Sequence, residues 1–386
     1  MRAIRTRTDG WRRRLAAAAA ALLTLPLAAG EIDPPFRART YRAAMERTGS
    51  AMPIGKVVEI KPPLGLPPVP VPPDNPPTAE TIALGRKLFF DKRLSADGTV
   101  ACSSCHDPKY AMSDPNRFSS GIQDRKGTRN APPVFNAAYL FTQFWDGRAM
   151  SLEHQARGPV QNPIEMAHSL PGVERRLAAD PKYVALFAQA FGPGRITFEM
   201  VEKSIATYER TLLSGNSPFD RYYYGGDKKA MSPAAIRGLN LFLDITLDGP
   251  NCVSCHRIEP NYATFTEVRF HNTGVAFVPS TGAFTDIGRE KISGHQKDRG
   301  AFKVPTLRNI ALTSPYMHNG SMTTLEETVQ FYFDGGRANP HLSGVVPHAG
   351  VHNIPRDKQA QAKADLVEFM KALTGETPPL ASPPGE

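Results

Sequence analysis

The segments Cys102-Ser-Ser-Cys105-His106 and Cys252-Val-Ser-Cys255-His256 decide how this chain is built. Both have the form C-x-x-C-H, the attachment signature of c-type haem. Two thiols one helical turn apart can add across the two vinyl groups of a haem, and the following histidine then directs its imidazole at the iron. The sequence therefore predicts two covalently bound haem c groups, each held by two cysteines and one histidine.

The use of cysteine supports this interpretation. All four cysteines of the chain lie in the two motifs, and none is left over. Two disulfides would be the usual expectation for an exported chain with four cysteines, but the paired spacing favours haem. A zinc site or a dithiol redox pair is the other alternative. Zinc sites commonly need further Cys or His at tight spacing, and neither motif has such neighbours.

The first thirty residues have the pattern of an export signal. Six arginines precede an Ala/Leu-rich stretch, and Ala28, Ala29 and Gly30 offer a cleavage site. The apolar run Leu15–Ala29 contains Pro26 and is short for a membrane span, although a retained anchor is the alternative. We expect a periplasmic protein with no membrane span once residues 1–30 are removed.

Composition indicates a globular chain without a nucleic-acid partner. The chain has 386 residues, with 41% hydrophobic and 22% charged residues, which argues against a wholly disordered protein. The length favours two domains. The formal net charge is +9, but residues 1–30 carry six Arg and one Asp, or +5 of it, which leaves +4 for the remainder. That bias is too weak to indicate nucleic-acid binding.

A repeated pattern, G-x-x-L-F-x-D, precedes each haem motif at Gly85–Asp91 and Gly238–Asp244. Each copy lies in an apolar-periodic helix for which Thr78 or Ser232 is the expected N-cap. We therefore predict a mostly α fold with two cytochrome-c-like haem domains related by duplication, long loops and little strand. The expected division is a signal peptide 1–30, a Pro-rich N-terminal segment 31–77, haem domains 78–230 and 231–376, and a tail 377–386.

Other elements follow from the same rules. Apolar spacing predicts a helix over residues 198–212 with Gly215 as its C-cap, and another over 366–373 that Gly375 stops. A short strand is expected near residues 267–271. Residues 62–77 are Pro-rich and predict an extended strap.

Two further stretches resemble one known family. They are Asn130-Ala-Pro…Phe144-Trp145-Asp146-Gly147-Arg148…Gln155…Gly158-Pro159…Asn162-Pro163…Glu165-Met166 and Leu307-Arg308-Asn309…Leu312-Thr313-Ser314-Pro315-Tyr316-Met317-His318-Asn319-Gly320. Together with the haem motifs they resemble the bacterial di-haem cytochrome c peroxidases, a family that includes MauG. The resemblance implies a peroxide-reactive first haem, with proximal ligand His106, and an electron-transfer second haem, with proximal ligand His256.

The resemblance also implies a catalytic set around the first haem. Glu165 matches the distal acid/base, Gln155 the amide beside it, and Pro159 a wall of the pocket. A carboxylate over a buried haem can move a proton between the two peroxide oxygens, since desolvation raises its pKa toward neutrality. The alternative for Glu165 is a solvated surface residue.

The first haem is expected to be open without prior reduction. Many relatives close it with a distal histidine on the loop after C-x-x-C-H, but this sequence has no histidine between His106 and His154. His154 itself is the alternative ligand. Trp145 matches an indole that the family places between the haems, for which core packing is the alternative. The only other tryptophan, Trp11, lies in the export signal.

The second axial ligand of the second haem defines the branch of the family. Peroxidases have a Met fourteen residues beyond the histidine that matches His318, and here that position is Tyr332. A Tyr at this position is typical of MauG-like members. A capping box at Thr324–Glu327 opens a helix that places Leu325, Val329 and Tyr332 on one face. A core Tyr332, with Met317 or Met322 as the ligand, is the alternative. A phenolate ligand would favour ferric and higher-valent iron.

The match implies a calcium site as well. Asn130, Thr313 and Pro315 correspond to the family's interdomain Ca²⁺ ligands, and hard oxygen donors suit this ion. The alternative is that they are turn residues without a metal. His271 and His318 have no assigned role and are expected to hydrogen-bond to haem propionates or to backbone.

The sequence thus predicts a periplasmic di-haem peroxidase of the MauG-like branch. It would reduce hydrogen peroxide to water with electrons from a small cytochrome c or cupredoxin. One alternative is a MauG-like oxidase that modifies aromatic residues of a partner protein. Another is an electron carrier with no open iron.

Overall fold

The polypeptide is mostly helical with little strand, as predicted, and the computed structural model describes residues 51–245, 250–348, 354–379, 381 and 383. The export signal and residues 31–50 lie outside the described residues. The helices are α3 (Ala79–Phe89), α4 (Leu152–Gln161), α5 (Leu170–Ala178), α6 (Pro181–Phe191), α7 (Phe198–Glu209), α8 (Pro218–Tyr223), α9 (Pro233–Phe242), α10 (Glu290–Ser293), α11 (Leu325–Phe333), α12 (Val345–His348) and α13 (Arg356–Lys371).

Strand is confined to two antiparallel pairs of two-residue segments in the described part of the chain. β1 (Phe270–His271) pairs with β4 (Phe302–Lys303), and β2 (Phe277–Val278) pairs with β3 (Ala283–Phe284). The expected strand near residues 267–271 is therefore present in its last two residues.

Helix starts follow the capping residues that the sequence offers. The side chain of Thr78 accepts from the amide of Thr81 at the start of α3, and that of Ser232 accepts from the amide of Ala235 at the start of α9. At α11 the expected capping box forms between Thr324 and Glu327. These three predictions are confirmed.

The predicted end of the helix over 198–212 is wrong. α7 ends at Glu209, and the amide of Arg210 bonds to the carbonyl of Ala206. Gly215 does not cap it. A Cβ at Gly215 would lie 2.8 Å from the carbonyl oxygen of Leu64, so this glycine instead allows the N-terminal segment to approach closely.

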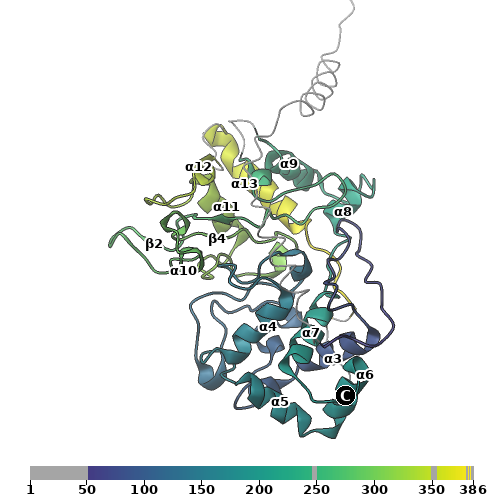
Figure 1. The fold of residues 1–386 in the computed structure, drawn as a ribbon. Helices are drawn as coiled ribbons and strands as arrows, with labels where there is room; N and C mark the ends of the chain where they lie inside the picture. The colour runs from purple at the N-terminus through teal and green to yellow at the C-terminus, as the bar shows by residue number, and fades with distance from the viewer. Residues whose placement is uncertain (1–50, 246–249, 349–353, 380, 382, 384–386) are drawn as a thin grey trace, which may run out of the picture. The chain divides into compact units, whose positions relative to one another are not determined.

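The buried apolar side chains form two main clusters, one for each haem motif. The first runs from Leu84 to Leu212 and includes α3, α5, α6 and α7, and the second runs from Phe219 to Leu373 and includes α9, α11 and α13. α3 packs along α7, and α9 packs along α13 (Figure 1). Two haem motifs, each beside its own core, agree with two haem domains. The exact domain bounds stay predictions.

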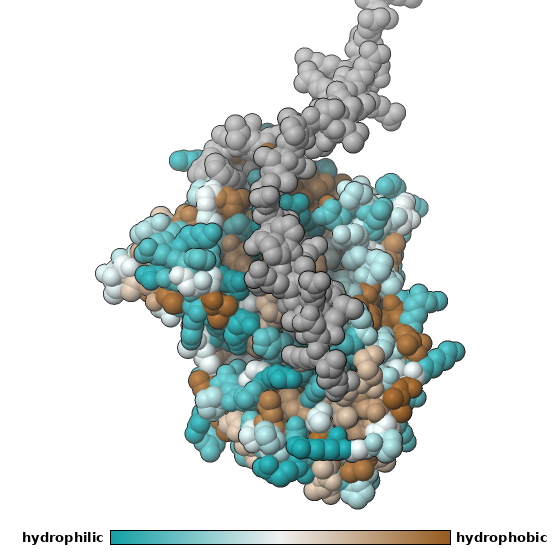
Figure 2. Space-filling view, in the orientation of Figure 1, coloured by the Kyte–Doolittle hydropathy of each residue, from teal (hydrophilic) through white to brown (hydrophobic). Residues whose placement is uncertain are grey.

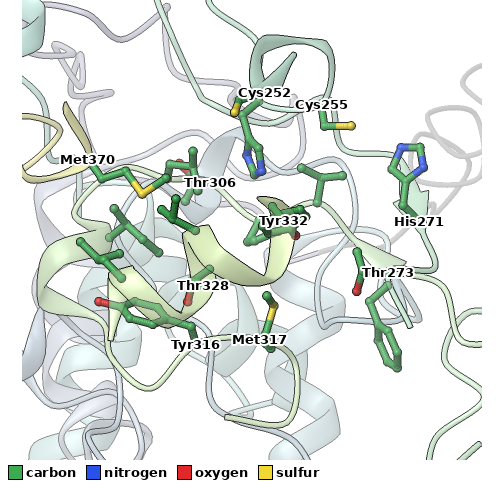
Figure 3. Close-up of a pocket in the computed structure, with 18 of the residues that line it drawn as sticks. Cys252, Cys255, His271, Thr273, Thr306, Tyr316, Met317, Thr328, Tyr332 and Met370 are labelled. Carbon is green, nitrogen blue, oxygen red and sulfur yellow. The ribbon is translucent and has the colours of Figure 1, made fainter. Parts of the chain in front are cut away.

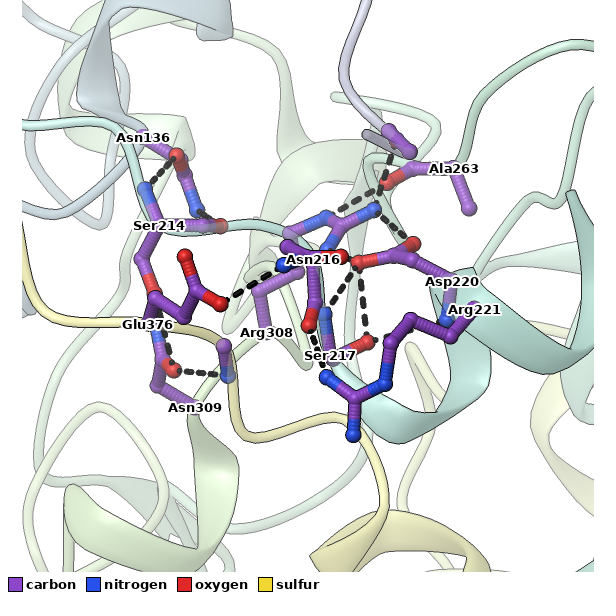
Figure 4. A network of polar contacts seen from close by, with 12 residues as sticks. Asn136, Ser214, Asn216, Ser217, Asp220, Arg221, Ala263, Arg308, Asn309 and Glu376 are labelled. Carbon is purple, nitrogen blue, oxygen red and sulfur yellow. Dashed lines mark hydrogen bonds and ion pairs between the residues drawn. The ribbon is translucent and has the colours of Figure 1, made fainter. Parts of the chain in front are cut away.

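Residues 51–77, which include the predicted strap of residues 62–77 and are called the strap from here on, contact both halves of the described chain. The Nζ of Lys203 in α7 donates to the carbonyls of Ala51 and Asp74, at 2.8 Å each. In the C-terminal half, Arg308 donates to the carbonyl of Gly65 at 2.6 Å and pairs with Asp220 (Figure 4). The strap is thus fixed by buried cations at both of its ends and at its middle.

The segment after α13 returns to the N-terminal half. The amide of Glu376 donates to the carbonyl of Gly215 at 2.9 Å, and Ala381 is buried in the first cluster. On the face seen in Figure 2, hydrophilic and hydrophobic residues are interspersed. Among the described residues, no helix has the length and apolar character needed to cross a membrane.

Candidate functional site

The first C-x-x-C-H motif borders a cavity of about 170 Å³, which we call the first cavity. Cys102–Ser104 forms a 3₁₀ turn, and the amide of His106 donates to the carbonyl of Cys102 at 3.0 Å. Cys105 and His106 line the cavity, whereas Cys102 packs against the first apolar cluster. The cysteines are not joined in disulfides.

His106 is held in the state that a metal requires. Its Nδ1 lies 3.3 Å from the carbonyl oxygen of Met112, and burial lowers the pKa of the imidazole, so the ring is neutral at neutral pH. When Nδ1 donates its proton to the carbonyl, Nε2 keeps its lone pair for a metal ion.

Three predicted residues join His106 around the first cavity. α4 contributes Gln155 and Pro159, and the turn after it contributes Glu165. The side chain of Asn162 donates to Oε1 of Glu165 at 2.7 Å, which fixes the carboxyl group. Burial raises the pKa of Glu165, against the opposing effects of this hydrogen bond and of Arg148. The cavity therefore contains a fixed carboxyl group that takes up a proton more readily than an exposed glutamate.

His154 takes no part in either cavity. It lies on α4 but is exposed, and it does not line the first cavity beside its neighbour Gln155. Of the described residues around the first cavity, only Cys105 and His106 belong to the types that commonly ligate haem iron.

The second motif borders a second cavity, of about 180 Å³ (Figure 3). Cys252, Cys255 and His256 line it, and Cys252–Ser254 again forms a 3₁₀ turn. Nδ1 of His256 lies 2.9 Å from the carbonyl oxygen of Phe265, and burial lowers the pKa of this imidazole too. The two histidines thus have equivalent surroundings, as a duplication would produce.

The candidates for the second axial position differ in their placement. Tyr332 and Met317 both line the second cavity, and Figure 3 shows Tyr332 between the two cysteines and Met317 in that view. Met322 does not line it. Burial raises the pKa of the Tyr332 phenol.

The two cavities share a border. Asn130, Pro132, Pro133 and Trp145 line both of them. The indole Nε1 of Trp145 donates to the carbonyl of Asn130 at 2.9 Å, which fixes the plane of the ring.

Comparison with known proteins assigns this geometry to a family. A family model described as di-haem cytochrome c peroxidase matches residues 79–229. The chain is 38% identical over 318 residues to the methylamine utilization protein MauG of Methylorubrum extorquens, covering 82% of this chain and 84% of that protein. The chain belongs to the di-haem cytochrome c peroxidase and MauG family.

Other relatives in this family agree. The cytochrome c551 peroxidase of Nitrosomonas europaea is 36% identical over 309 residues, which cover 80% of this chain and 84% of that protein. The crystal structure of a MauG-like protein associated with microbial copper homeostasis is 35% identical and has a TM-score of 0.74, covering 83% of this chain and 98% of that one. Relatives named cytochrome c peroxidase and relatives named MauG are therefore both similar to this chain. The chain is an enzyme of this family.

The described residues fit the two c-type haems that the family implies. Each motif has two unbridged cysteine thiols, of which Cys105 lines the first cavity and both Cys252 and Cys255 line the second, and a neutral histidine whose Nδ1 faces a carbonyl. The second cavity is mostly lined by apolar side chains, which suits a macrocycle. Haem would be held by Cys102, Cys105 and His106 in the first and by Cys252, Cys255 and His256 in the second.

The three predicted calcium residues all belong to the lining of the second cavity. Asn130, Thr313 and Pro315 all line it, and the side chain of Asn130 donates to the carbonyl of Asn116 at 3.1 Å. These three residues offer neutral oxygen donors, and the Cys255, Glu267 and His271 cluster of possible metal ligands among the described residues includes none of them.

Glu209 is a site residue that the sequence analysis missed. It lines the first cavity at the end of α7, is 6% exposed, and its Oε2 is without a hydrogen-bond partner among the described residues. Burial raises its pKa to about 8. Its spacing of four from Ile205, on the apolar face of α7, is a signal that could have identified it.

Lys303 and His318 are further buried groups at the second cavity. Nζ of Lys303 donates to the carbonyl of Thr142 at 2.6 Å, and burial lowers its pKa to about 7. The His318 ring stacks on Phe302 at 3.6 Å between centroids, and its Nε2 has no partner in the described part of the chain. Both residues of β4 are buried and line the second cavity, so no polar/apolar alternation in the sequence marks Lys303 as a site residue.

His271 has a partner that differs from the expected ones. Its Nε2 lies 2.6 Å from a carboxylate oxygen of Glu267 rather than bonding to backbone. Glu267, His271 and Cys255 offer ligand atoms within 4.8 Å of one another. Because Cys255 belongs to the haem motif, this cluster is part of the second haem site.

Proposed function

We propose that hydrogen peroxide is reduced to water in the first cavity, and that the second cavity exchanges the electrons that this reaction needs. The observation that carries the proposal is the composition of the first cavity. It combines one neutral histidine, His106, with a partly buried carboxyl group, Glu165, and among its described lining only Cys105, which belongs to the attachment motif, is a further residue of a usual haem-ligand type. This is the arrangement that a peroxide-binding position requires.

The protein's side chains would handle the protons of the reaction. When bound, haem iron supplies the peroxide-binding and electron-transfer chemistry that side chains lack. Reduction of one peroxide takes up two electrons and two protons and yields two waters. Glu165 would accept the proton of one peroxide oxygen and return it to the other, which leaves as water. Gln155 would orient the peroxide, and Pro159 would exclude water from this wall.

Trp145 would connect the two cavities. It lines both of them, and its indole is fixed by the hydrogen bond to Asn130. An aromatic ring at this position shortens the distance that an electron must cross between the two haem sites.

Tyr332 would hold the haem iron of the second cavity together with His256, an arrangement that would be typical of the MauG-like branch. Its place in the cavity lining supports this, and Met317 is the competing ligand. Burial raises the pKa of the free phenol, but a bound cation reverses that effect and favours the phenolate. Asn130, Thr313 and Pro315 would bind Ca²⁺ near the shared border.

The sequence and the relatives support a proposal for the cellular location and the electron donor of the reaction. Residues 1–30 would direct the chain to the periplasm. A small cytochrome c or a cupredoxin would supply the electrons, and the name of the cytochrome c551 peroxidase relative favours the cytochrome.

A second candidate function is oxidation of aromatic residues in a partner protein. The 38% identity to a MauG and the position of Tyr332 favour it. Peroxide consumption that needs a particular partner, rather than a small electron donor, would distinguish it from the first.

Electron spin resonance of the resting ferric holoprotein tests the proposal. We expect one high-spin signal from the open site and one low-spin signal unlike His/Met ligation, and we expect peroxide to abolish the high-spin signal. Two low-spin signals, with no response to peroxide, would overturn the open site and favour an electron carrier.

A further inference from the structure

A series of aromatic rings leads from the protein surface to the second cavity. It begins at Tyr223, the last residue of α8, whose side chain is 41% exposed. The Tyr223 ring stacks on Phe219 with centroids 5.2 Å apart and planes at 22°. Phe219 is fully buried and packs edge-on against Phe265, at 5.1 Å.

The inner end of this series reaches the haem-binding residues in two ways. The carbonyl oxygen of Phe265 lies 2.9 Å from Nδ1 of His256, so one hydrogen bond joins the series to the proximal histidine. The ring of Phe265 also packs against Phe242 at 6.1 Å, and Phe242 lines the second cavity. Consecutive ring contacts therefore leave no wide gap between Tyr223 and the cavity.

Of the two tyrosines at the outer end, only Tyr223 can release its proton directly to water. A tyrosine that loses an electron also loses its phenolic proton. The hydroxyl of neighbouring Tyr224 donates to the carbonyl of Glu259 at 2.9 Å, and a carbonyl does not take up that proton. Burial also raises the pKa of Tyr224. The Tyr223 hydroxyl makes no hydrogen bond within the described residues, and its side chain reaches solvent.

We propose that Tyr223 is a surface oxidation site, at which reductants too large for the cavities give up electrons one at a time. The inference rests on the proposed function, because peroxide reduction supplies the oxidising equivalents. Tyr223 gives one electron toward the second cavity and one proton to water. A reductant at the surface then returns one electron, and water returns the proton.

The surroundings favour anionic one-electron donors. Lys228 and Lys229 are exposed close to Tyr223 in the chain, and Nζ of Lys228 lies 4.8 Å from the centre of the Tyr222 ring. Without a donor, two Tyr223 radicals from two molecules would couple. Two tyrosines and one peroxide then give one dityrosine and two waters, which balances atoms and electrons.

Peptide mass spectrometry of the holoprotein after peroxide treatment without a reductant tests the inference. Tyr110 is the matched control, because it is 43% exposed but belongs to no aromatic ring pair in the described part of the chain. We expect oxidised or dityrosine-linked peptides that contain Tyr223, severalfold above those that contain Tyr110. Tyr223→Phe should remove the dityrosine fluorescence, and Tyr110→Phe should leave it unchanged.

A second experiment adds ferrocyanide, an anionic one-electron donor, to the same holoprotein. Added before peroxide, it should suppress the modification of Tyr223 severalfold. Peroxide that disappears while Tyr223 stays unmodified, or that modifies Tyr110 equally, would overturn the surface site and leave the proposed function standing. Peroxide that is not consumed at all would overturn both.

Discussion

Two carboxyl groups line the first cavity, the partly buried Glu165 and the buried Glu209, and their partners differ. Glu165 accepts a hydrogen bond from Asn162 at 2.7 Å, whereas Oε2 of Glu209 has no partner among the described residues. Burial raises the pKa of both. A fixed carboxyl group suits directed proton transfer, and an unpartnered one with a high pKa suits storage of a proton.

The role of Glu165 is testable with Glu165→Gln, which keeps the shape of the side chain and removes its acid/base function. We expect the reaction with peroxide to slow by about 10²–10⁴-fold, the usual contribution of a positioned general acid/base. Stopped-flow absorbance of the haem bands measures the rate. Glu326→Gln, at an exposed position of α11, is the control and should react like the wild type. Equal rates in all three proteins would rule out the proton transfer by Glu165.

Glu209 should make stability depend on pH. Burial raises its pKa to about 8 from an ordinary value of 4.5. At a pH between these two values, the folded protein keeps a proton that the unfolded chain has lost. This contribution to the free energy of unfolding is fully present below the unfolded pKa of 4.5, and it is lost as the pH rises to the folded pKa of about 8. Glu209→Gln cannot ionise, so its free energy of unfolding should fall less, by about 1.4 kcal/mol for each pKa unit of the shift.

Urea unfolding at about pH 5 and about pH 9, which span nearly the whole range between the two pKa values, measures the Glu209 effect. Glu59→Gln in the strap is exposed and should keep the pH dependence of the wild type. If the wild type and Glu209→Gln lost the same stability between these two conditions, Glu209 would not hold a proton in the folded protein.

At the scale of helices, the repeated G-x-x-L-F-x-D pattern has the same structural use in both halves. A Cβ at Gly85 in α3 would lie 1.9 Å from the carbonyl oxygen of Ser204 in α7, and one at Gly238 in α9 would lie 2.0 Å from that of Asp365 in α13. In each half the glycine allows the helix that precedes the haem motif to touch its partner helix.

Gly85→Ala and Gly238→Ala should therefore each destabilise the protein. The added methyl group meets backbone, which moves less easily than a side chain, so we expect a loss of at least about 1–3 kcal/mol, as for other overpacked cores. Urea unfolding of the holoproteins gives the free energies. Gly344→Ala is the control, because nothing lies within 4 Å of a Cβ at that position and the residue lines neither cavity. A similar loss in the control would show that the helix contacts are not the cause.

The sequence could predict the helices that have local signals and not the contacts between them. Thr78, Ser232 and Thr324 start α3, α9 and α11 because a cap and its target amides lie within a few residues. Gly215 was misassigned as a helix cap because its use, next to Leu64, depends on a segment far away in the chain.

In the candidate site, too, the sequence predicts the residues that have a local signal and not those that depend on distant contacts. Cys102–His106 and Cys252–His256 are contiguous motifs, and the placement of Glu165 and Gln155 around one cavity followed from resemblance to a family. Glu209 and Lys303 belong to no local motif. The spacing of Glu209 from Ile205 indicates a buried face of α7, but only the packing of distant elements creates the cavities that the two residues line. The roles of all these residues remain predictions.

At the scale of the whole described chain, one buried cation ties the middle of the strap to the C-terminal half. Arg308 donates to the carbonyls of Gly65 in the strap and Ala263 in the C-terminal half, at 2.6 and 2.7 Å. It also pairs with both carboxylate oxygens of Asp220, at 2.8 and 2.9 Å (Figure 4). The two side chains are 1% and 0% exposed, so water cannot replace either partner.

Asp220→Asn should consequently cost far more than the loss of a surface ion pair. The variant keeps the shape of the side chain but leaves the Arg308 guanidinium buried without a counter-charge, for which about 3–5 kcal/mol is typical. Glu368→Gln is the control, because its pair with Lys371 is 42% and 54% exposed and should contribute less than about 1 kcal/mol.

Unfolding in urea gives both losses, and limited proteolysis shows where the Asp220→Asn protein opens. Since Gly65 depends on Arg308, cleavage should appear first in the strap, residues 51–77, while both haem groups stay covalently attached. Replacing both partners, as in Arg308→Leu with Asp220→Leu, should restore only part of the stability. That change removes the unpaired charge, but it leaves the carbonyls of Gly65 and Ala263 without their donor. A complete restoration would mean that the charge pair alone, and not its grip on the strap, explains why this arginine is buried.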